Sequence, residues 1–164
     1  MIETRPILSG VRVLDFGRYV AGPYCATLLG YLGAEVIRIE KIGGSEDRYI
    51  APICEGGEGG VFFQTACNKR SLALDFATPE GAALLRELAG GFDVVVENFK
   101  PGVIAEMGMG FEALKAIKPD IILCSISALG QSGPLAGKPG YDYIAQAYAG
   151  VTSMIGDPDQ PPYV

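Results

Sequence analysis

Histidine is absent from all 164 residues of the sequence. Without it the chain cannot form a Ser-His-Asp triad or a Cys-His pair, and it cannot complete the zinc sets that combine histidine with cysteine. The cysteines Cys25, Cys54, Cys67 and Cys124 are spread out, with no C-x-x-C pair. The sequence therefore predicts reduced thiols and no metal site.

The sequence also lacks long apolar runs and clusters of basic residues. No apolar run reaches the ~18 residues that a membrane span needs, and the N-terminal residues lack the basic and apolar regions of a signal peptide. Nineteen acidic and thirteen basic residues give a net charge of −6, which argues against a nucleic-acid surface. We expect a cytoplasmic protein without nucleic-acid or membrane partners, in which helix N-termini and a few cations hold any anionic ligand.

What the sequence does contain is the composition of a globular domain. Apolar residues make up 49% of the chain and charged residues 20%, as in ordinary folded domains. A domain of this length buries roughly two thirds of the surface that its unfolded chain exposes, so a stable core is expected. One domain is the default prediction.

Short β-prone segments alternate with helical ones along the chain. Strands are predicted at residues 11–16, 35–40, 71–75, 93–97 and 121–127, and helices at 24–32, 78–89, 101–107, 111–117 and 141–150. Residues 41–60 are rich in Gly, Glu and Pro without any period, which indicates a long excursion of the kind that often carries function. The alternation predicts an α/β fold: a Rossmann-like, open, mostly parallel sheet flanked by helices.

The helix at 78–89 has the clearest predicted boundaries. Thr78 offers a capping hydroxyl, Pro79 suits the first helical position and Glu80 is favourable to the helix dipole. Gly90 and Gly91 end the pattern. We expect a stable helix between these signals.

In an open parallel sheet, ligands bind outside the carboxyl ends of the strands. The places to search are therefore the loops after Phe16, Glu40, Glu97 and Ser127. The first loop, residues 17–23, is not G-x-G-x-x-G and no acidic residue follows it in a ribose-binding position, which argues against a dinucleotide. Its Gly22-Pro23 step fits either a tight turn or a backbone approach to a ligand at a helix N-terminus.

The other loops carry polar residues with competing interpretations. Lys41 alone reads as a solvated surface charge, and the run Asn68-Lys69-Arg70 as a charged turn. Residues 97–102 favour a shaped site, because a polar strand end, an aromatic residue and a proline-started helix come together there. Residues 141–143 read as a helix start at which Asp142 suits the dipole. From the residues alone, the prediction is an α/β domain with strand-end loops suited to an anionic ligand.

Seven segments, taken in order, resemble the class III CoA-transferase family, which includes formyl-CoA transferase and the carnitine CoA-transferases. The segments are Leu14-Asp-Phe, Ala21-Gly-Pro-Tyr-Cys-Ala, Leu32-Gly-Ala-Glu-Val-Ile-Arg-Ile-Glu40, Cys67-Asn-Lys-Arg-Ser-Leu-Ala-Leu-Asp75, Thr78-Pro-Glu-Gly81, Val95-Val-Glu-Asn-Phe-Lys-Pro-Gly102 and Gly140-Tyr-Asp-Tyr-Ile-Ala-Gln146. They span almost the whole chain. Each is weak alone, but together they identify the family.

The resemblance implies a chemistry and an architecture. Family members move CoA between carboxylic acids through an Asp nucleophile, which becomes an aspartyl-CoA thioester, and they form interlocked homodimers. Residues 1–164 then correspond to the N-terminal Rossmann-like portion, and the nucleophile is expected a few residues beyond Val164. Asp142 and Asp157 are not expected to replace it, since both precede the nucleophile segment. We expect this chain alone to bind CoA without transferring it.

The resemblance also implies contacts with CoA. It assigns the loop at Val20 and Ala21, Lys41 at a phosphate, the Leu74 and Phe76 edge around the adenine, and Asn98 with Phe99 near the pantetheine. Tyr141 matches a position where transferases place an aromatic beside the thioester and where related racemases carry a catalytic His, so a racemase is disfavoured. Leu74 and Phe76 could equally be core residues, and Glu106 stands where relatives often carry an Arg near the phosphates.

Two other functions remain open from the sequence. One is a nucleotide-binding α/β module of another family, and the other is a non-catalytic half that needs a partner chain. Tight binding of NAD would favour the former. The acyl donor and acceptor are small carboxylates that the sequence does not distinguish.

Overall fold

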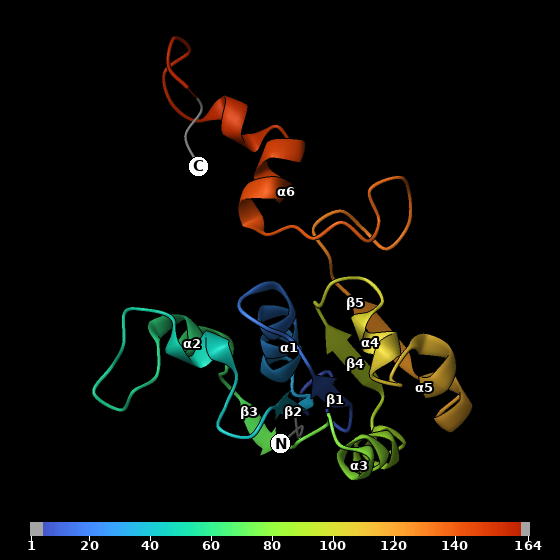
Figure 1. The fold of residues 1–164 in the computed structure, drawn as a ribbon. Coiled ribbons are helices and arrows are strands. Elements are labelled where there is room, and N and C mark those ends of the chain that lie inside the picture. Colours follow the sequence, from blue (N-terminus) through green and yellow to red (C-terminus); the bar gives the residue numbers. More distant parts are fainter. Residues whose placement is uncertain (1–4, 162–164) are drawn as a thin grey trace.

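A five-stranded parallel sheet organises the protein in a computed structural model that describes residues 5–161 (Figure 1). Its strands are β1 (Arg12–Asp15), β2 (Glu35–Glu40), β3 (Lys69–Ala73), β4 (Val94–Glu97) and β5 (Ile122–Ser125), in the order β3-β2-β1-β4-β5. Val13 of β1 pairs in register with Val36 on one side and Val94 on the other. The central strand is thus the first one in the chain.

Helices connect the strands and cover the sheet. They are α1 (Ala21–Tyr31), α2 (Gly60–Thr65), α3 (Pro79–Ala89), α4 (Val103–Glu106), α5 (Phe111–Ile117) and α6 (Asp142–Tyr148), with short 3-10 helices η1 (Glu46–Tyr49) and η2 (Val151–Met154). The inner strand β4 begins with three valines because both of its faces are covered, whereas the inner strands β1 and β2 also carry charged residues. In the part of the chain that the structure describes, no helix is long and apolar enough to cross a membrane.

The two faces of the sheet carry separate cores. On one face, Leu14, Ile39 and Val95 pack with residues of α3, α4 and α5. On the other, Val13, Val36 and Val96 pack against Ala26 of α1. Successive residues of each strand point to opposite faces, which is why neighbours in sequence enter different cores.

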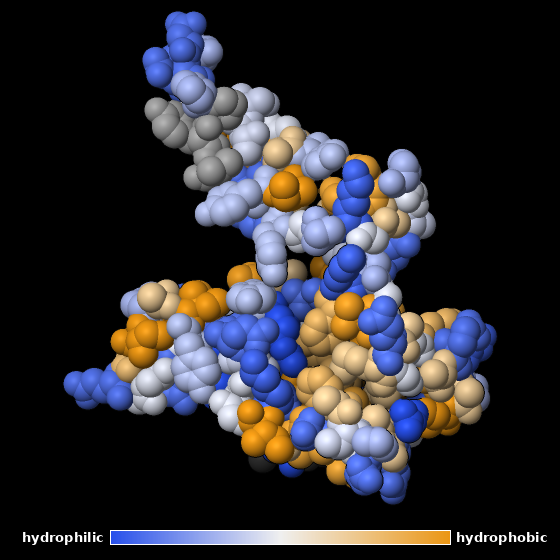
Figure 2. Space-filling view, in the orientation of Figure 1, coloured by the Kyte–Doolittle hydropathy of each residue, from blue (hydrophilic) through white to orange (hydrophobic). Residues whose placement is uncertain are grey.

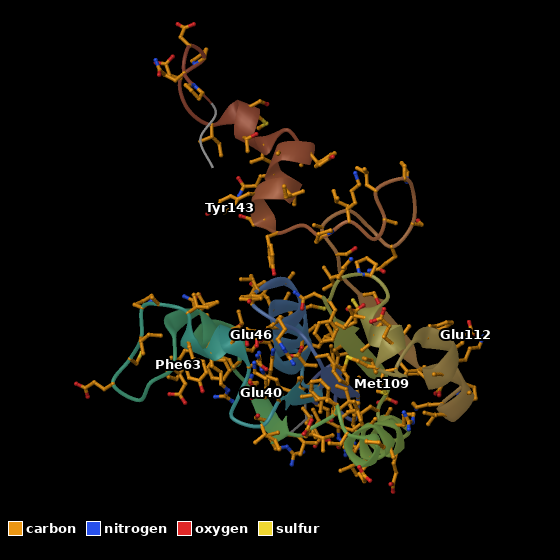
Figure 3. All side chains as sticks on the ribbon, viewed as in Figure 1. Glu40, Glu46, Phe63, Met109, Glu112 and Tyr143 are labelled. Carbon is orange, nitrogen blue, oxygen red and sulfur yellow. The ribbon has the colours of Figure 1, made fainter. Side chains whose placement is uncertain are left out.

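A C-terminal arm, residues 128–161, stands apart from this body (Figure 1). No residue from 122 to 161 is buried, and α6 and η2 contact mainly each other. Figure 3 shows Tyr143 on α6, well away from the sheet. The arm therefore contributes no side chain to either core.

The predicted α/β class with a parallel sheet is confirmed. The predicted bounds of β2 and α5 are those observed, and the helix expected at 78–89 is α3 with Thr78 as its cap. The prediction for residues 68–70 was wrong at Lys69. This residue is not in a charged turn but starts β3, and its side chain is buried by pairing with Asp15. Within the predicted excursion, η1 was not foreseen.

Candidate functional site

Residues from four separate segments meet at the carboxyl edge of the sheet. Val20 and Ala21 begin α1, Lys41 follows β2, Asn98 and Phe99 follow β4, and Tyr141 precedes α6. Asn98 bonds to the backbone of Arg18, and the Tyr19 and Tyr141 rings meet edge to face at 6.1 Å. Parallel strands bring these loops together because all of their carboxyl ends share one edge.

The backbone of residues 17–19, hereafter loop 17–19, is held by side-chain oxygens. Each of its N–H groups donates to a different side chain. Gly17 N donates to Asp15 Oδ1 at 2.7 Å, Arg18 N to Asn98 Oδ1 at 2.7 Å, and Tyr19 N to Asp47 Oδ2 at 3.0 Å. Asn98 Nδ2 in turn donates to Arg18 O at 2.9 Å. The loop is fixed without forming regular secondary structure.

Tyr19 adopts a backbone conformation that side chains rarely take. Its φ is 61°, in the left-handed region, where a residue other than glycine costs on the order of 1 kcal/mol or more. The conformation turns the chain outward, and the Tyr19 and Val20 side chains are exposed. The hydrogen bonds to loop 17–19 offset this strain.

Two buried cations lie behind the carboxylates of the loop. Lys69 Nζ lies 2.7 Å from Asp15 Oδ2, with side-chain exposures of 2% and 0%, and it also donates to Pro23 O at 2.6 Å. Arg38 Nη2 lies 2.7 Å from Asp47 Oδ2. Burial lowers the pKa of Lys69, although the charge of Asp15 and its hydrogen bond oppose the shift. Each aspartate thus faces a backbone N–H on one side and a cation on the other.

Glu40, at the end of β2, joins the same buried network. It accepts hydrogen bonds from Arg48 Nη2 and Ser71 Oγ, both at 2.6 Å, and lies 3.2 Å from Arg38 Nε. Burial acts to raise the pKa of Glu40, but the bonds from Arg48 and Ser71 and the nearby arginine charges outweigh it and lower the pKa to about 2. Figure 3 shows Glu40 and Glu46 on the α2 side of the body.

Arg18 fixes the ends of the two central strands. Its Nη1 donates to Phe16 O, Gly17 O and Ile39 O at 3.0, 2.9 and 3.2 Å, and its guanidinium lies 5.6 Å from the centre of the Phe99 ring. Burial and the charge of Arg38 lower the pKa of Arg18. The guanidinium therefore links β1, β2 and the segment after β4.

The Gly22-Pro23 step is explained by packing inside the protein. A Cβ atom on Gly22 would lie 2.8 Å from Asn98 Oδ1 and 2.8 Å from Gly17 Cα. Glycine is needed because the start of α1 passes directly against the Asn98 amide. The tight-turn interpretation accounts for this residue without a ligand.

The remaining predicted contact residues differ in exposure. Lys41 is exposed and pairs with Glu46 at 3.1 Å, and Tyr141 is 72% exposed. Leu74 and Phe76 are half-buried and pack against the core that contains Leu85 of α3, as the alternative of core residues expects. Their contact with an adenine stays a prediction.

Asp142 and Asp157, which are not expected to replace the nucleophile, lie at exposed positions. Asp142 accepts a hydrogen bond from Gln146 Nε2 at 2.6 Å, and Asp157 accepts one from the backbone of Asp159 at 3.1 Å. Both lie exposed on the C-terminal arm. Glu106, where relatives often carry an Arg, ends α4 and is exposed.

A pocket of about 320 Å³ lies between α2 and β3, on the α1 face of the sheet. Its lining includes the cations Arg38, Arg48, Lys69 and Arg70. Each of these is paired with a carboxylate, respectively Asp47, Glu40, Asp15 and Glu35. The pocket is therefore lined by side chains that support loop 17–19 from behind. Carboxylates already neutralise the positive charge of this lining.

Sequence reasoning missed the buried ion pairs. Asp15 lies between Leu14 and Phe16, and Arg38 lies between Ile37 and Ile39, and charged residues in a covered strand are rarely buried unless they are paired. That position in the strand is the signal by which both could have been found. Asp47 gave no such signal, because it lies in the aperiodic excursion whose path only the folded chain reveals.

Comparisons with known proteins agree on one family. The family model described as CoA-transferase family III matches residues 8–164. The chain is 40% identical over 169 residues to the succinate–glutarate CoA-transferase of Agrobacterium fabrum, covering 99% of this chain and 42% of the relative. It is 41% identical over 159 residues to the succinyl-CoA:glutarate CoA-transferase of Homo sapiens, covering 94% of this chain and 36% of the relative.

A solved structure has the same fold. The crystal structure of a CAIB/BAIF family protein from Brucella suis superposes with a TM-score of 0.89 at 39% sequence identity, covering 98% of this chain and 44% of that protein. The chain therefore spans less than half the length of the relatives that it matches.

Proposed function

The chain belongs to CoA-transferase family III, and from that premise we propose that it forms the acyl-CoA-binding portion of an enzyme that moves CoA between an acyl-CoA thioester and a small carboxylic acid. The observation that carries the proposal is the carboxyl edge of the sheet. There, Asn98 and Asp47 hold the backbone of loop 17–19, the Tyr19 ring contacts the Tyr141 ring, and Val20 follows the loop at the start of α1. A site fixed in advance loses less entropy when it binds a flexible ligand.

The proposed substrates are short dicarboxylic acids and their CoA thioesters. Relatives at about 40% identity are named for succinate and glutarate, and another, from Chloroflexus aurantiacus, for succinyl-CoA and D-citramalate. These acids share a second carboxylate remote from the thioester. The residues that choose among these acids are proposed to lie partly beyond Val164.

The proposed chemistry uses an aspartate beyond Val164. Its carboxylate attacks the thioester carbonyl carbon, the carbon–sulfur bond breaks and CoA leaves as the thiolate, which gives a mixed anhydride. The thiolate then attacks the aspartyl carbonyl and displaces the donor acid, which leaves an aspartyl-CoA thioester. The acceptor carboxylate regenerates the aspartate by the same two steps in reverse order.

The residues of this chain bind and orient the CoA in this scheme. Val20 and Ala21 offer backbone at the start of α1, Lys41 pairs with a phosphate, and Leu74 with Phe76 bounds the adenine. Asn98 and Phe99 line the pantetheine path, and the exposed Tyr141 ring lies beside the thioester. In the complete enzyme we propose a homodimer, and the four free thiols fit a reducing cytoplasm.

The test separates binding from turnover. We expect the chain to bind CoA in a calorimetric titration, and to give no enzyme-bound hydroxamate when it is incubated with succinyl-CoA and glutarate and then treated with hydroxylamine. A hydroxamate on Asp142 or Asp157 would place the nucleophile inside this sequence. Tighter binding of NAD than of CoA would contradict the proposal.

A matched pair of variants checks the contact at Lys41. Lys41→Gln should weaken CoA binding because it removes a charge opposite a phosphate, whereas Lys115→Gln on α5 should not. Pantetheine lacks the nucleotide phosphates, so its affinity should be the same for wild type and Lys41→Gln. Equal loss for both ligands would remove Lys41 from the phosphate site.

A further inference from the structure

The arrangement around Asp47 is more elaborate than a surface loop requires. Asp47 belongs to η1, in the excursion between β2 and α2, yet its side chain is buried against the end of the sheet. Both of its oxygens accept from Arg38 Nη2 at 2.7 Å, and Oδ2 also accepts from Tyr19 N. A buried carboxylate in this position is stable only because the buried Arg38 faces it.

The backbone that Asp47 holds is the strained one. Tyr19 has a φ of 61°, and its ring contacts Tyr141 edge to face. Without an acceptor for Tyr19 N, the peptide could rotate into an extended conformation and carry the ring out of this contact. The orientation of the aromatic pair therefore depends on one hydrogen bond from a different segment.

We propose that Asp47 is a positioning residue of the acyl-CoA site: its carboxylate, neutralised by Arg38 from behind, fixes Tyr19 in the left-handed conformation and so orients the Tyr19–Tyr141 pair for the ligand. Asp15, backed by Lys69, does the same for Gly17 N, and Asn98 for Arg18 N. Asp47 acts through the loop and needs no contact with the ligand. The inference rests on the proposed function for the identity of the ligand.

The decisive comparison is between two double variants that both lack the buried Arg38–Asp47 ion pair. Arg38→Met/Asp47→Asn keeps an oxygen that can accept from Tyr19 N, and Arg38→Met/Asp47→Ala does not. We expect the first to bind CoA within about twofold of wild type, and the second to bind about five- to tenfold more weakly, as expected for loss of one buried hydrogen bond. Amide exchange at Tyr19 should accelerate in the second variant only.

A control uses a similar but more exposed arrangement at the opposite end of the sheet, where the side chains of Lys118 and Asp93 are 21% and 41% exposed. Asp93 Oδ2 accepts from Arg12 N at 2.9 Å, and Asp93 Oδ1 lies 3.0 Å from Lys118 Nζ. Lys118→Met/Asp93→Ala should lower stability and leave the CoA affinity and the exchange at Tyr19 unchanged. A loss of affinity equal to that of the Arg38→Met/Asp47→Ala variant would show a general effect of stability and overturn the inference.

Two further results would each overturn one of the two proposals. Equal CoA affinity and equal Tyr19 exchange in the Asp47→Ala and Asp47→Asn double variants would overturn the positioning role. A wild-type chain that binds no CoA would overturn the proposed function of this chain instead. In that case the exchange rate at Tyr19, which needs no ligand, still decides whether Asp47 holds the loop.

Discussion

At the scale of single residues, charged side chains inside the sheet are the features that set the shape of the site. Glu40 is almost fully buried, yet three partners keep it ionised: Arg48, Ser71 and Arg38. An ion in such a place stabilises the fold only while its partners are present and charged. Its titration should therefore be visible in the stability of the whole chain.

The pH dependence has a definite sign. The pKa of Glu40 is lowered to about 2 in the folded chain and is about 4.3 in an unfolded one. Its contribution is therefore complete above about pH 4.3 and is lost as the pH falls toward about 2, a change on the order of 2 to 3 kcal/mol. Urea unfolding of the wild type between pH 5 and pH 2 should show this decline.

Substitution of Glu40 measures how much of the loss of stability at low pH is due to this residue. Glu40→Gln should start from lower stability at pH 7, because Arg48 and Arg38 lose a charged partner, and it should vary less between pH 5 and pH 2. Glu112→Gln, at an exposed position of α5 (Figure 3), should keep the profile of the wild type. If the profiles of Glu40→Gln and the wild type ran parallel, Glu40 would not be the titrating group.

At the scale of elements, α3 shows how directly local chemistry sets a boundary. Thr78 Oγ1 accepts from Gly81 N at 3.1 Å and Pro79 fills the first position. We expect Thr78→Ala to lower the free energy of unfolding by about 1 kcal/mol, since a backbone N–H loses its acceptor. The midpoint of urea unfolding measures it.

The conservative variant gives the control for this cap. Thr78→Ser keeps the hydroxyl and should unfold within a few tenths of a kcal/mol of the wild type. If Thr78→Ala and Thr78→Ser were equally stable, the hydroxyl of Thr78 would contribute nothing to the helix.

The same elements show which parts of the fold could be predicted from the sequence. The pattern predicted β2, α3 and α5 because the signals within each segment agree. For β2 the signal is the apolar alternation, and for the helices it is the apolar periodicity together with the residues that start or end the helix. It misplaced the start of β3, because Lys69 looks like a turn residue until Asp15 is known to face it. The pairing joins residues 54 apart in sequence, and such contacts leave no local signal.

The candidate site also has parts that could be predicted from the sequence and parts that could not. Asn98 and Tyr141 could be placed at the carboxyl edge, since each follows or precedes a recognisable element. That the Asn98 amide bonds the backbone of Arg18, and that Asp47 reaches Tyr19, follows from the folded path of an aperiodic segment. The sequence could place these loops at one edge of the sheet, whereas the buried aspartates and cations that support them, Asp15, Asp47, Arg38 and Lys69, were missed. The roles of the predicted residues toward CoA stay predictions.

At the scale of the whole molecule, the body buries many of its apolar side chains, whereas the C-terminal arm buries none. The arm exposes Tyr141, Tyr143, Tyr148 and Met154, the last at 82%, and in Figure 2 the part that carries α6 is mostly pale or blue with isolated orange residues. Exposed apolar side chains of this kind on a folded domain commonly mark an interface. We expect the isolated chain to dimerise or aggregate.

Sedimentation velocity tests this expectation. The wild type should sediment above the monomer mass, and a variant with Tyr143→Gln, Tyr148→Gln and Met154→Gln should shift toward the monomer, because these side chains lie outside both cores. A monodisperse wild-type monomer with a cooperative thermal transition would contradict the expectation.

The hydrogen bonds that hold loop 17–19 span very different distances along the chain. Asp15 lies 2 residues from its partner, Asp47 lies 28 and Asn98 lies 80. A chain that leaves the ribosome from its N-terminus can make the first bond at once, the second after η1 has emerged, and the third only when β4 has been synthesised and has docked beside β1. A nascent chain that ends before Asn98 therefore carries every side chain of the loop but lacks the amide that completes its shape.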